Sequence, residues 1–285
     1  MLPLPMNKNV RQRLRRVASR QNPLVKDLRR AFARSETTPD GSCAIESVRL
    51  VEEAIRSGLK FRAVFFRQSS LAVADRLLPQ IAAQVETVLL PNEIFDSAVA
   101  TETPQGVAAL VHPRVSRLDE LFSPAAPLIL GCAGLQDPGN FGTILRSAEA
   151  FGASGLIATE GTVSTANPKV ARASAGSLFR LPVIRLTTVE ALAALEEHGV
   201  QLAVTSSHAT LKQAGSKLHA RPVQEVDLTQ PIAIFIGSEG QGVPRAFLDA
   251  ADEAILIPHS PKVESLNAAI AASILLYEAQ RQRSR

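Results

Sequence analysis

The chain has 285 residues, 46% of them hydrophobic, and a formal net charge of +4. It is long enough for two domains with buried cores, and it lacks the apolar run of roughly 18 to 20 residues that a membrane span needs. Its two cysteines, Cys43 and Cys132, have no metal-ligand spacing and its first residues lack the order of a secretory signal, so we expect buried free thiols, no metal and a cytoplasmic protein.

The positive charge is concentrated at the N-terminus. Residues 1–34 contain ten Lys or Arg and one acid, Asp27, so the rest of the chain is net acidic. We interpret this segment as a basic, partly helical arm that contacts a polyanion, because each neutralised phosphate adds salt-dependent affinity. A solvated helix face is the alternative, and a membrane-surface helix is disfavoured by the lack of an apolar stripe. The candidate RNA-binding residues are Arg11, Arg13, Arg15, Arg16, Arg20 and Lys26.

A small α/β unit follows this segment. Apolar residues at helical spacing predict helices over 45–58 and 72–84 and a short one over 92–100, and β-rich runs predict strands over 61–66, 85–90 and 107–111. Prolines and weak periodicity then indicate a linker over 113–126. The first domain is therefore expected to span residues 1–112.

From residue 127 onward, short apolar runs alternate with helical stretches. The runs lie at 128–134, 155–159, 181–186, 201–205, 232–237 and 253–258. Uninterrupted apolar strands that alternate with helices are typical of a parallel sheet covered on both faces. We therefore expect a second α/β domain over 127–285.

Three of these expected strands end in unusual loops, "LQDPGNFGTILR", "GSEGQGVP" and "PHSPKVESLNAA". Ligands bind at the carboxyl ends of strands in such sheets, so we expect one pocket there. The glycine spacing fits neither the dinucleotide fingerprint nor the P-loop, which disfavours a phosphate cradle. Glycines can instead expose main-chain groups to a purine, although a tight turn shaped by Gly237 and Gly242 is the alternative. The candidate cofactor-binding residues are Ile236, Gly237, Gly242, Ile257, Pro258 and Leu266.

Arg146 is the most distinctive charged residue, because it is one of only three basic residues between 101 and 150. Asn140 is the expected N-cap of the helix that carries it, and a surface arginine is the alternative for Arg146. Ser265 and Asn267 are expected in the first turn of the C-terminal helix. That helix is apolar almost all round, which indicates a homodimer.

These residues resemble the SpoU (TrmH-type) branch of the SPOUT RNA methyltransferases. The segments "NFGTILRSAEAFGA", "IAIFIGSEGQGVP" and "ILIPHSPKVESLNAAIAASILLYE" correspond to its three motifs, and residues 16–112 are similar to its substrate-binding domain. The resemblance implies an α/β fold, in which a smaller L30e-like domain precedes a SPOUT domain with a parallel sheet and a deep trefoil knot. It also implies a homodimer and S-adenosyl-L-methionine (AdoMet) as the cofactor.

The implied reaction is methyl transfer from AdoMet to a ribose 2′-OH of structured RNA, with 23S ribosomal RNA favoured. The alternatives are a tRNA 2′-O-methyltransferase and a non-catalytic RNA-binding or ribosome-assembly protein. A nucleotide-dependent oxidoreductase is a further rival, which the missing dinucleotide fingerprint disfavours.

The resemblance also implies roles for single residues. The family's active-site positions correspond to Asn140, Arg146, Glu239, Ser265 and Asn267, and its AdoMet pocket to Gly237, Ile257 and Leu266. Because a guanidinium stays protonated in proteins, we expect Arg146 to act electrostatically, on an RNA phosphate and a developing alkoxide. The chain departs from the family at Ser47, where Gly is common, and at His259, where Met is frequent.

Overall fold

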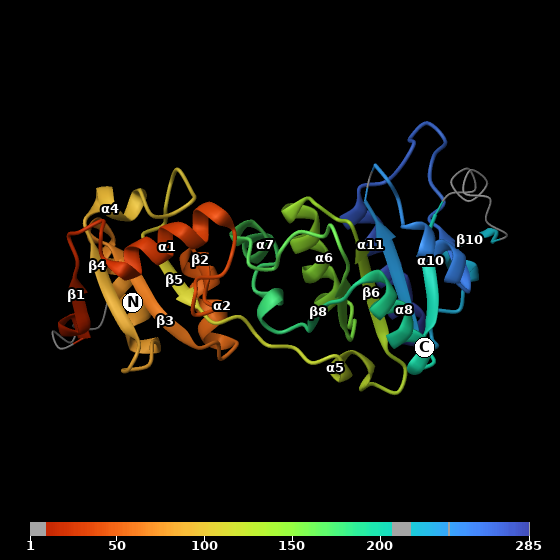
Figure 1. Ribbon diagram of the computed structural model, residues 1–285, viewed down its shortest axis with the longest axis horizontal. Helices are drawn as coiled ribbons and strands as arrows, with labels where there is room; N and C mark the ends of the chain where they lie inside the picture. The colour runs from red at the N-terminus through yellow and green to blue at the C-terminus, as the bar shows by residue number, and fades with distance from the viewer. Residues whose placement is uncertain (1–9, 207–217, 239, 285) are drawn as a thin grey trace, which may run out of the picture. The chain divides into compact units, whose positions relative to one another are not determined.

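The computed structural model describes residues 10–206, 218–238 and 240–284. Its internal contacts divide the chain into two compact units (Figure 1). The N-terminal unit comprises Met1–Arg114 and Ser164–Arg180, and the C-terminal unit comprises Val115–Val163 and Leu181–Arg285. Residues 164–180, which lie within the expected second domain, group with the N-terminal unit because Ala171 and Phe179 are buried in its core.

The N-terminal unit is a five-stranded sheet between two helical layers. Its elements are β1 (Leu14–Arg16), β2 (Cys43–Glu46), β3 (Phe61–Arg67), β4 (Glu86–Leu90), β5 (Val107–Val111), α1 (Pro23–Arg34), α2 (Val48–Arg56), α3 (Leu71–Leu77), α4 (Asn92–Asp96) and α7 (Pro168–Ala173). The strand order is β1-β4-β3-β5-β2, in which β5 runs antiparallel to β2 and β3, and β4 runs parallel to β1 and β3. Helices α1 and α4 cover one face, and α2 and α3 cover the other.

The three strands expected in this unit are confirmed as β3, β4 and β5. The helix expected over 45–58 is wrong at its start, because Cys43–Glu46 forms β2 and the helix begins at Val48. Between them, Ser47 has φ 98° and ψ 147°, a backbone conformation that interrupts any helix. The expected helix over 72–84 ends early at Leu77, with Pro79 in the single 3₁₀ turn that follows.

The described part of the basic segment, residues 10–34, belongs to the N-terminal unit rather than to a separate arm. Residues 1–9 lie outside the described residues. Strand β1 pairs in parallel with β4, and α1 buries Val25, Leu28 and Phe32 in the core. The expectation of an arm was wrong because it weighed the charges of α1 and overlooked the apolar stripe between them. The segment therefore presents its cations from a folded surface.

The C-terminal unit is built around a seven-stranded, fully parallel sheet. Its elements are β6 (Leu128–Ala133), β7 (Gly155–Ala158), β8 (Val183–Arg185), β9 (Gln201–Thr205), β10 (Ala220–Pro222), β11 (Ile232–Gly237), β12 (Glu253–Leu256), α5 (Asp119–Phe122), α6 (Pro138–Ala150), α8 (Thr188–Glu197), α10 (Arg245–Ala250) and α11 (Ala268–Arg283). The strand order is β10-β12-β9-β11-β6-β7-β8. Helices α5, α8 and α10 contribute to the core on one face of the sheet, whereas α6 and α11 pack together on the other (Figure 1).

All six strands expected in this half are confirmed, and with them the α/β fold with a parallel sheet. The edge strand β10 was not expected, since three residues give no pattern. The expected linker contains α5, whose Leu121 is fully buried. The trefoil knot and the homodimer stay predictions.

Candidate active site

The loops of the expected pocket leave one edge of the C-terminal sheet. Strands β6 and β11 pair in register up to Ala133 and Gly237. Strand β12 is separated from β11 only by β9, which places these two strands about 10 Å apart. The chain segments after β6, β11 and β12 therefore start close to one another.

The loop after β11 is a tight turn that requires its glycines. A Cβ added to Gly237 would lie 1.9 Å from the carbonyl carbon of Gly242 and 2.2 Å from the amide nitrogen of Val243. Gly242 itself has φ +66° and forms an isolated bridge with Ser238. Turn geometry alone thus explains both glycines, and the same turn exposes main-chain groups to its surroundings.

A cavity of about 400 Å³ lies between this turn and the segment after β12. It is lined by five of the six candidate cofactor residues: Ile236, Gly237, Gly242, Ile257 and Leu266. Pro258 is not among its lining residues. Four further residues, which were not among the candidates, also line the cavity: Thr205, Ser206, His259 and Glu264. Thr205 and Ser206 lie at the end of an expected strand at the same sheet edge. His259 and Glu264 lie in one of the three loops expected to form the pocket.

His259 is anchored within this cavity by the backbone. Its Nδ1 lies 2.7 Å from the carbonyl oxygen of Ile257. Because a carbonyl oxygen only accepts hydrogen bonds, Nδ1 must carry the proton that it donates there. The second ring nitrogen, Nε2, is then an acceptor in the neutral imidazole.

Helix α6 begins differently from the expectation. Its N-cap is Asp137, whose Oδ1 accepts from the amide of Asn140 at 2.6 Å, and Pro138 is the first helical residue. The prediction that Asn140 is the N-cap was wrong, because proline is favoured at the first helical position and shifts the cap upstream. The Asn140 side chain, not used for capping, accepts a hydrogen bond from Nδ2 of Asn267 at 3.0 Å.

Asn267 connects two of the loops. It is the N-cap of α11, and its Oδ1 accepts from the amides of Ala269 at 2.9 Å and Ile270 at 3.3 Å. Its amide nitrogen reaches Asn140 on α6, so one side chain both closes α11 and holds α6. Ser265 was expected in the first turn of this helix but precedes its N-cap, where it is exposed and lines the 400 Å³ cavity.

Arg146 does not join this cluster. It lies on the exposed side of α6, opposite the buried Ile144 and Leu145, and lines neither of the two cavities at this edge. Within the described residues, it has no hydrogen-bond or ion-pair partner. Glu239 lies outside the described residues.

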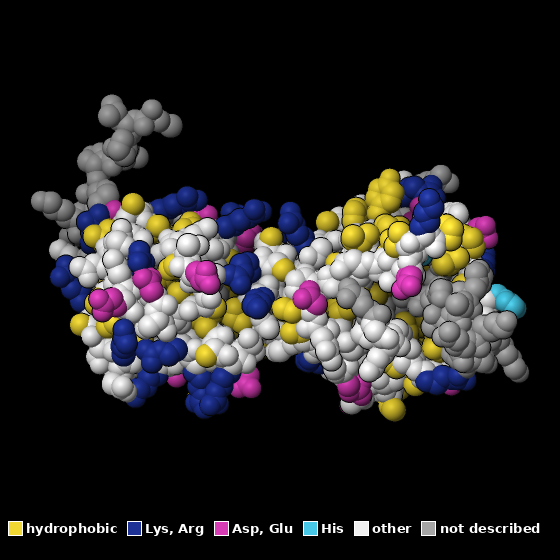
Figure 2. All heavy atoms as spheres, turned by 90° about the horizontal axis from the view of Figure 1, so that it is seen from above, with side chains coloured by type: hydrophobic (Ala, Val, Ile, Leu, Met, Phe, Trp, Pro, Cys, Tyr) yellow, Lys and Arg dark blue, Asp and Glu magenta, His cyan; other side chains and the backbone are white. Residues whose placement is uncertain are grey.

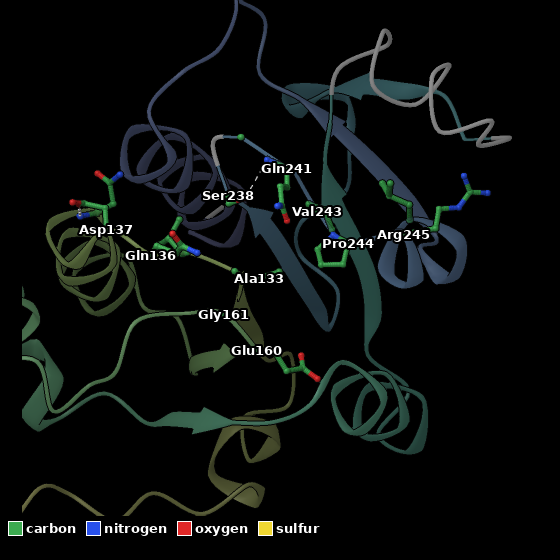
Figure 3. Close-up of a pocket in the computed structure, with 16 residues that line it drawn as sticks. Ala133, Gln136, Asp137, Glu160, Gly161, Ser238, Gln241, Val243, Pro244 and Arg245 are labelled. Carbon is green, nitrogen blue, oxygen red and sulfur yellow. Dashed lines mark hydrogen bonds between the residues drawn. The ribbon is translucent and has the colours of Figure 1, made fainter. Parts of the chain in front are cut away.

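A second cavity, of about 980 Å³, opens at the same sheet edge (Figure 3). The loops after β6, β7 and β11 and the start of α10 surround it, and Asn140 is among its lining residues. It shares the turn after β11 with the 400 Å³ cavity, because Ser238, Gly240, Gln241, Gly242 and Val243 line both. No pattern in the sequence distinguishes this second cavity from the first.

The candidate RNA-binding residues fall into two groups. Arg11 forms a two-bond ion pair with Asp75 at 2.6 and 2.7 Å, Arg15 pairs with Glu86, and Arg13 donates to three backbone carbonyl oxygens at 2.7 to 3.1 Å. The side chains of Arg16, Arg20 and Lys26 have no hydrogen-bond or ion-pair partner among the described residues, and all three residues are exposed. Figure 2 shows that Lys and Arg side chains on this half are interspersed with acidic ones.

Both thiols are buried, as expected. Burial raises the pKa of Cys43 to about 11 and that of Cys132 to about 12, so neither is a reactive thiolate at neutral pH. The described part of the chain contains no cluster of three potential metal ligands. Its helices also include none with the length and apolar character needed to cross a bilayer.

Comparison with known proteins adds to this geometry. Residues 127–277 match the family model of the SpoU rRNA Methylase family, and residues 22–109 match that of the MRM3-like substrate binding domain. An uncharacterized tRNA/rRNA methyltransferase of Synechocystis is 35% identical over 277 residues, covering 94% of each chain. The 23S rRNA (guanosine(2553)-2′-O)-methyltransferase RlmP of Bacillus subtilis is 30% identical and covers 93% of this chain and 98% of its own. An AdoMet-bound rRNA methyltransferase from Sinorhizobium meliloti superimposes with a TM-score of 0.79 at 26% identity, covering 94% of this chain and 98% of the other.

Proposed function

The chain belongs to the SpoU rRNA methylase family and is an AdoMet-dependent RNA 2′-O-ribose methyltransferase, and from this premise we propose that its substrate is structured 23S ribosomal RNA. The observation that carries the proposal is the match along nearly the whole of both chains to an enzyme named for 23S rRNA. Residues 1–112 would bind the RNA and residues 127–285 would carry the reaction. We also propose a cytoplasmic location, where ribosomal RNA is modified in bacteria.

The 400 Å³ cavity fits the adenosyl part of AdoMet. Ile236, Ile257 and Leu266 offer apolar walls, and the turn from Gly237 to Gly242 brings main-chain donors and acceptors to its rim. When bound, AdoMet supplies an electrophilic methyl group on a sulfonium sulfur. The task of the chain is then to hold the ribose hydroxyl in line with that methyl group, which can lower the barrier by roughly 7–11 kcal/mol.

Asn140 and Asn267 are proposed to fix the geometry of this reaction. Their 3.0 Å hydrogen bond ties the start of α6 to the start of α11, next to both cavities. Such a cross-link keeps the loops after β6 and β12 at a constant separation. Ser265, at the rim of the cofactor cavity, and Glu239 are proposed to orient the neighbouring loops and the ribose.

Arg146 is proposed to stabilise negative charge on the RNA. A protonated guanidinium can hold the phosphate next to the target and favour the alkoxide as the 2′-OH loses its proton. The proton would leave to a phosphate oxygen or to water, because Arg146 itself has no acceptor site. Its exposed position on α6 is suited to a large polyanionic substrate.

A homodimer through α6 and α11 is proposed from an uncovered apolar surface. Ile270, Ile274 and Tyr277 are 54%, 36% and 56% exposed along one side of α11, and they line a groove with Thr143 of α6. Figure 2 shows hydrophobic side chains gathered on one edge of the C-terminal half, where α11 lies. Arg146, one turn after Thr143, would then lie beside the partner subunit.

RNA binding is proposed for the exposed cations of the N-terminal unit. Arg16, Arg20 and Lys26 can contact phosphates without breaking an ion pair of the described structure, whereas Arg11, Arg13 and Arg15 already have structural partners. The chain has one Tyr and no Trp, which argues against recognition of single strands by stacking. Phosphate and shape recognition of folded RNA is the better fit.

The experiment that tests this function is a transcriptome-wide map of ribose methylation in cells with and without the gene. We expect one or a few 2′-O-methyl sites in 23S rRNA to disappear, and to return with the wild-type protein but not with Arg146→Ala. Loss of sites in tRNA alone would favour the tRNA alternative. An unchanged map, together with no AdoMet binding, would favour the non-catalytic alternative.

A further inference from the structure

The second cavity lies at a topological switch point of the C-terminal sheet. After β6 the chain turns to α6 on one face, and after the neighbouring β11 it turns to α10 on the other. Loops that diverge in this way open a crevice at the carboxyl ends of the strands, where ligands of open α/β sheets bind. The 980 Å³ cavity occupies that position and has no role in the function proposed above.

Its lining disfavours a phosphate group. Two acidic residues, Asp137 and Glu160, are among its lining residues, and their carboxylates accept from the amides of Asn140 and Thr188. The guanidinium of Arg245 is paired with Asp249 at 2.8 Å and points away from the cavity in Figure 3. An uncharged polar ligand is therefore a better match than an anion.

Two side-chain amides are available to such a ligand. Gln136 follows β6 and Gln241 follows β11, and both are exposed on the lining of the cavity (Figure 3). Neither amide group has a hydrogen-bond partner among the described residues. A carboxamide presents one donor and one acceptor side by side, the pattern that pairs with the edge of a nucleobase. Leu135, Val243 and Leu248 provide apolar walls for its faces.

We propose that this cavity receives the base of the nucleotide whose ribose is methylated, with Gln136 and Gln241 hydrogen-bonded to its edge. The proposal rests on the proposed function, and it adds a substrate-binding site to it. A base must leave its stack before an enzyme can enclose it, and a pocket beside the reaction centre stabilises the extruded form. The residues that line both cavities would then lie between the base and the cofactor: Ser238, Gly240, Gln241, Gly242 and Val243. Asn140 lines the base cavity.

The test begins with Gln136→Ala, because Gln136 lines only the second cavity. With unmodified 23S rRNA transcript, we expect kcat/KM to fall 10- to 50-fold, the loss of two hydrogen bonds to the base. The dissociation constant of AdoMet should stay within twofold, as should that of the whole RNA, which depends mainly on phosphates. Gln201→Ala, at an exposed glutamine that begins β9 and lines neither cavity, is the matched control and should behave as wild type.

A second measurement follows the base directly. An RNA fragment carries 2-aminopurine at the target position found by methylation mapping, and its fluorescence is recorded with the wild-type protein and S-adenosylhomocysteine. We expect a severalfold rise on binding, since the probe leaves the stack, and a smaller rise with Gln136→Ala and Gln136→Ala/Gln241→Ala.

Three results would overturn the assignment. The first is unchanged kcat/KM in both variants, and the second is no fluorescence rise with the wild-type protein. The third is a tenfold loss of AdoMet affinity in Gln136→Ala, which would make the cavity part of the cofactor site. Failure of the wild-type protein to methylate any RNA would contradict the proposed function instead, so the two failures are distinguishable.

Discussion

In the N-terminal unit, arginines hold the surface together through ion pairs and backbone carbonyls, whereas the two cavities of the C-terminal unit are surrounded mainly by glycines, amides and apolar side chains. Under the proposed function, charge would serve stability and RNA affinity in the first unit, and main-chain geometry would serve the reaction in the second. Because these roles fall in different units, RNA binding and turnover should be separable by mutation.

Arg146 departs from this division, because it is a cation of the C-terminal unit for which we propose a direct role in the reaction. Replacing it with Ala should lower kcat about 10²- to 10³-fold, because stabilisation of the developing alkoxide is lost. Arg146→Lys should recover little, since an ammonium lacks the planar fork. Steady-state kinetics and AdoMet titration measure both effects, and Arg117→Ala, at another exposed arginine of this unit, is the control. Near-normal turnover in Arg146→Ala would remove the assignment.

In the turn after β11, position 237 should not accept a side chain, whereas position 240 should. In Gly237→Ala the new Cβ would overlap the backbone of Gly242, so the turn must shift and AdoMet affinity should fall about 100-fold. Gly240→Ala is the matched control, because its Cβ meets nothing within 4 Å. Calorimetric AdoMet titration compares the two variants. Equal losses in both would show that flexibility, and not backbone contact, explains the glycines.

The surface cations should affect RNA binding alone. Arg16→Ala/Arg20→Ala/Lys26→Ala should weaken RNA binding about tenfold and reduce the slope of log K against log salt by about 3, one for each phosphate contact. Arg13→Ala should instead lower the free energy of unfolding by about 2 kcal/mol, since it loses hydrogen bonds to three carbonyls. Filter binding at several salt concentrations and denaturant unfolding separate these outcomes. If the salt dependence of RNA binding fell equally in the triple variant and in Arg13→Ala, the division into RNA-binding and structural cations would be wrong.

Ser47 should be a site of stored strain. At φ 98° and ψ 147° a serine is disfavoured by about 1–3 kcal/mol, although its Oγ caps α2 by accepting from Leu50 at 3.3 Å. Ser47→Gly should therefore raise the free energy of unfolding by about 1 kcal/mol after the lost cap is counted. Ser123→Gly, at φ −65°, should lower it. Urea unfolding decides, and a loss of stability in Ser47→Gly would mean that the cap outweighs the strain.

Glu46 should give the smallest effect, a change in pH dependence. Burial raises the pKa of its carboxyl, against the hydrogen bond from Thr101 and the charge of Arg172. The folded protein therefore holds the proton more tightly than the unfolded chain, so this residue's contribution to stability falls as pH rises above the ordinary glutamate pKa. Relative to Glu46→Gln, the wild type should lose stability as pH rises above about 4.5. The same pH dependence of the free energy of unfolding in the wild type and in Glu46→Gln would contradict this prediction.

Most of the fold could be predicted from the sequence because its signals are local. Uninterrupted apolar runs identified nine strands of the two sheets, and the cap residues and prolines explain where α6 and α3 begin and end. The misassigned residues, Ile45 and Glu46, end a short apolar run in which strand and helix patterns coincide. The boundary between β2 and α2 at Ser47 could not be predicted, because serine seldom adopts the backbone conformation found there.

The site was less predictable because it depends on contacts between distant segments. Asn140 and Asn267 are 127 positions apart, and no spacing rule announces their hydrogen bond. The second cavity likewise arises only when the loops after β6, β7 and β11 meet. The resemblance supplied residue positions without these contacts, and it stays the sole source for the knot.

Residues 164–180 belong to the N-terminal unit although they follow part of the C-terminal unit in sequence, and this limits how the protein can be divided into fragments. The chain passes between the two units three times, after Arg114, Val163 and Arg180, and the middle passage inserts Ala171 and Phe179 into the N-terminal core. A protease cut within residues 113–126 would therefore leave two fragments that still share a core. An N-terminal fragment made alone would lack Ala171 and Phe179 from its core, so it should fold only when residues 164–180 are supplied.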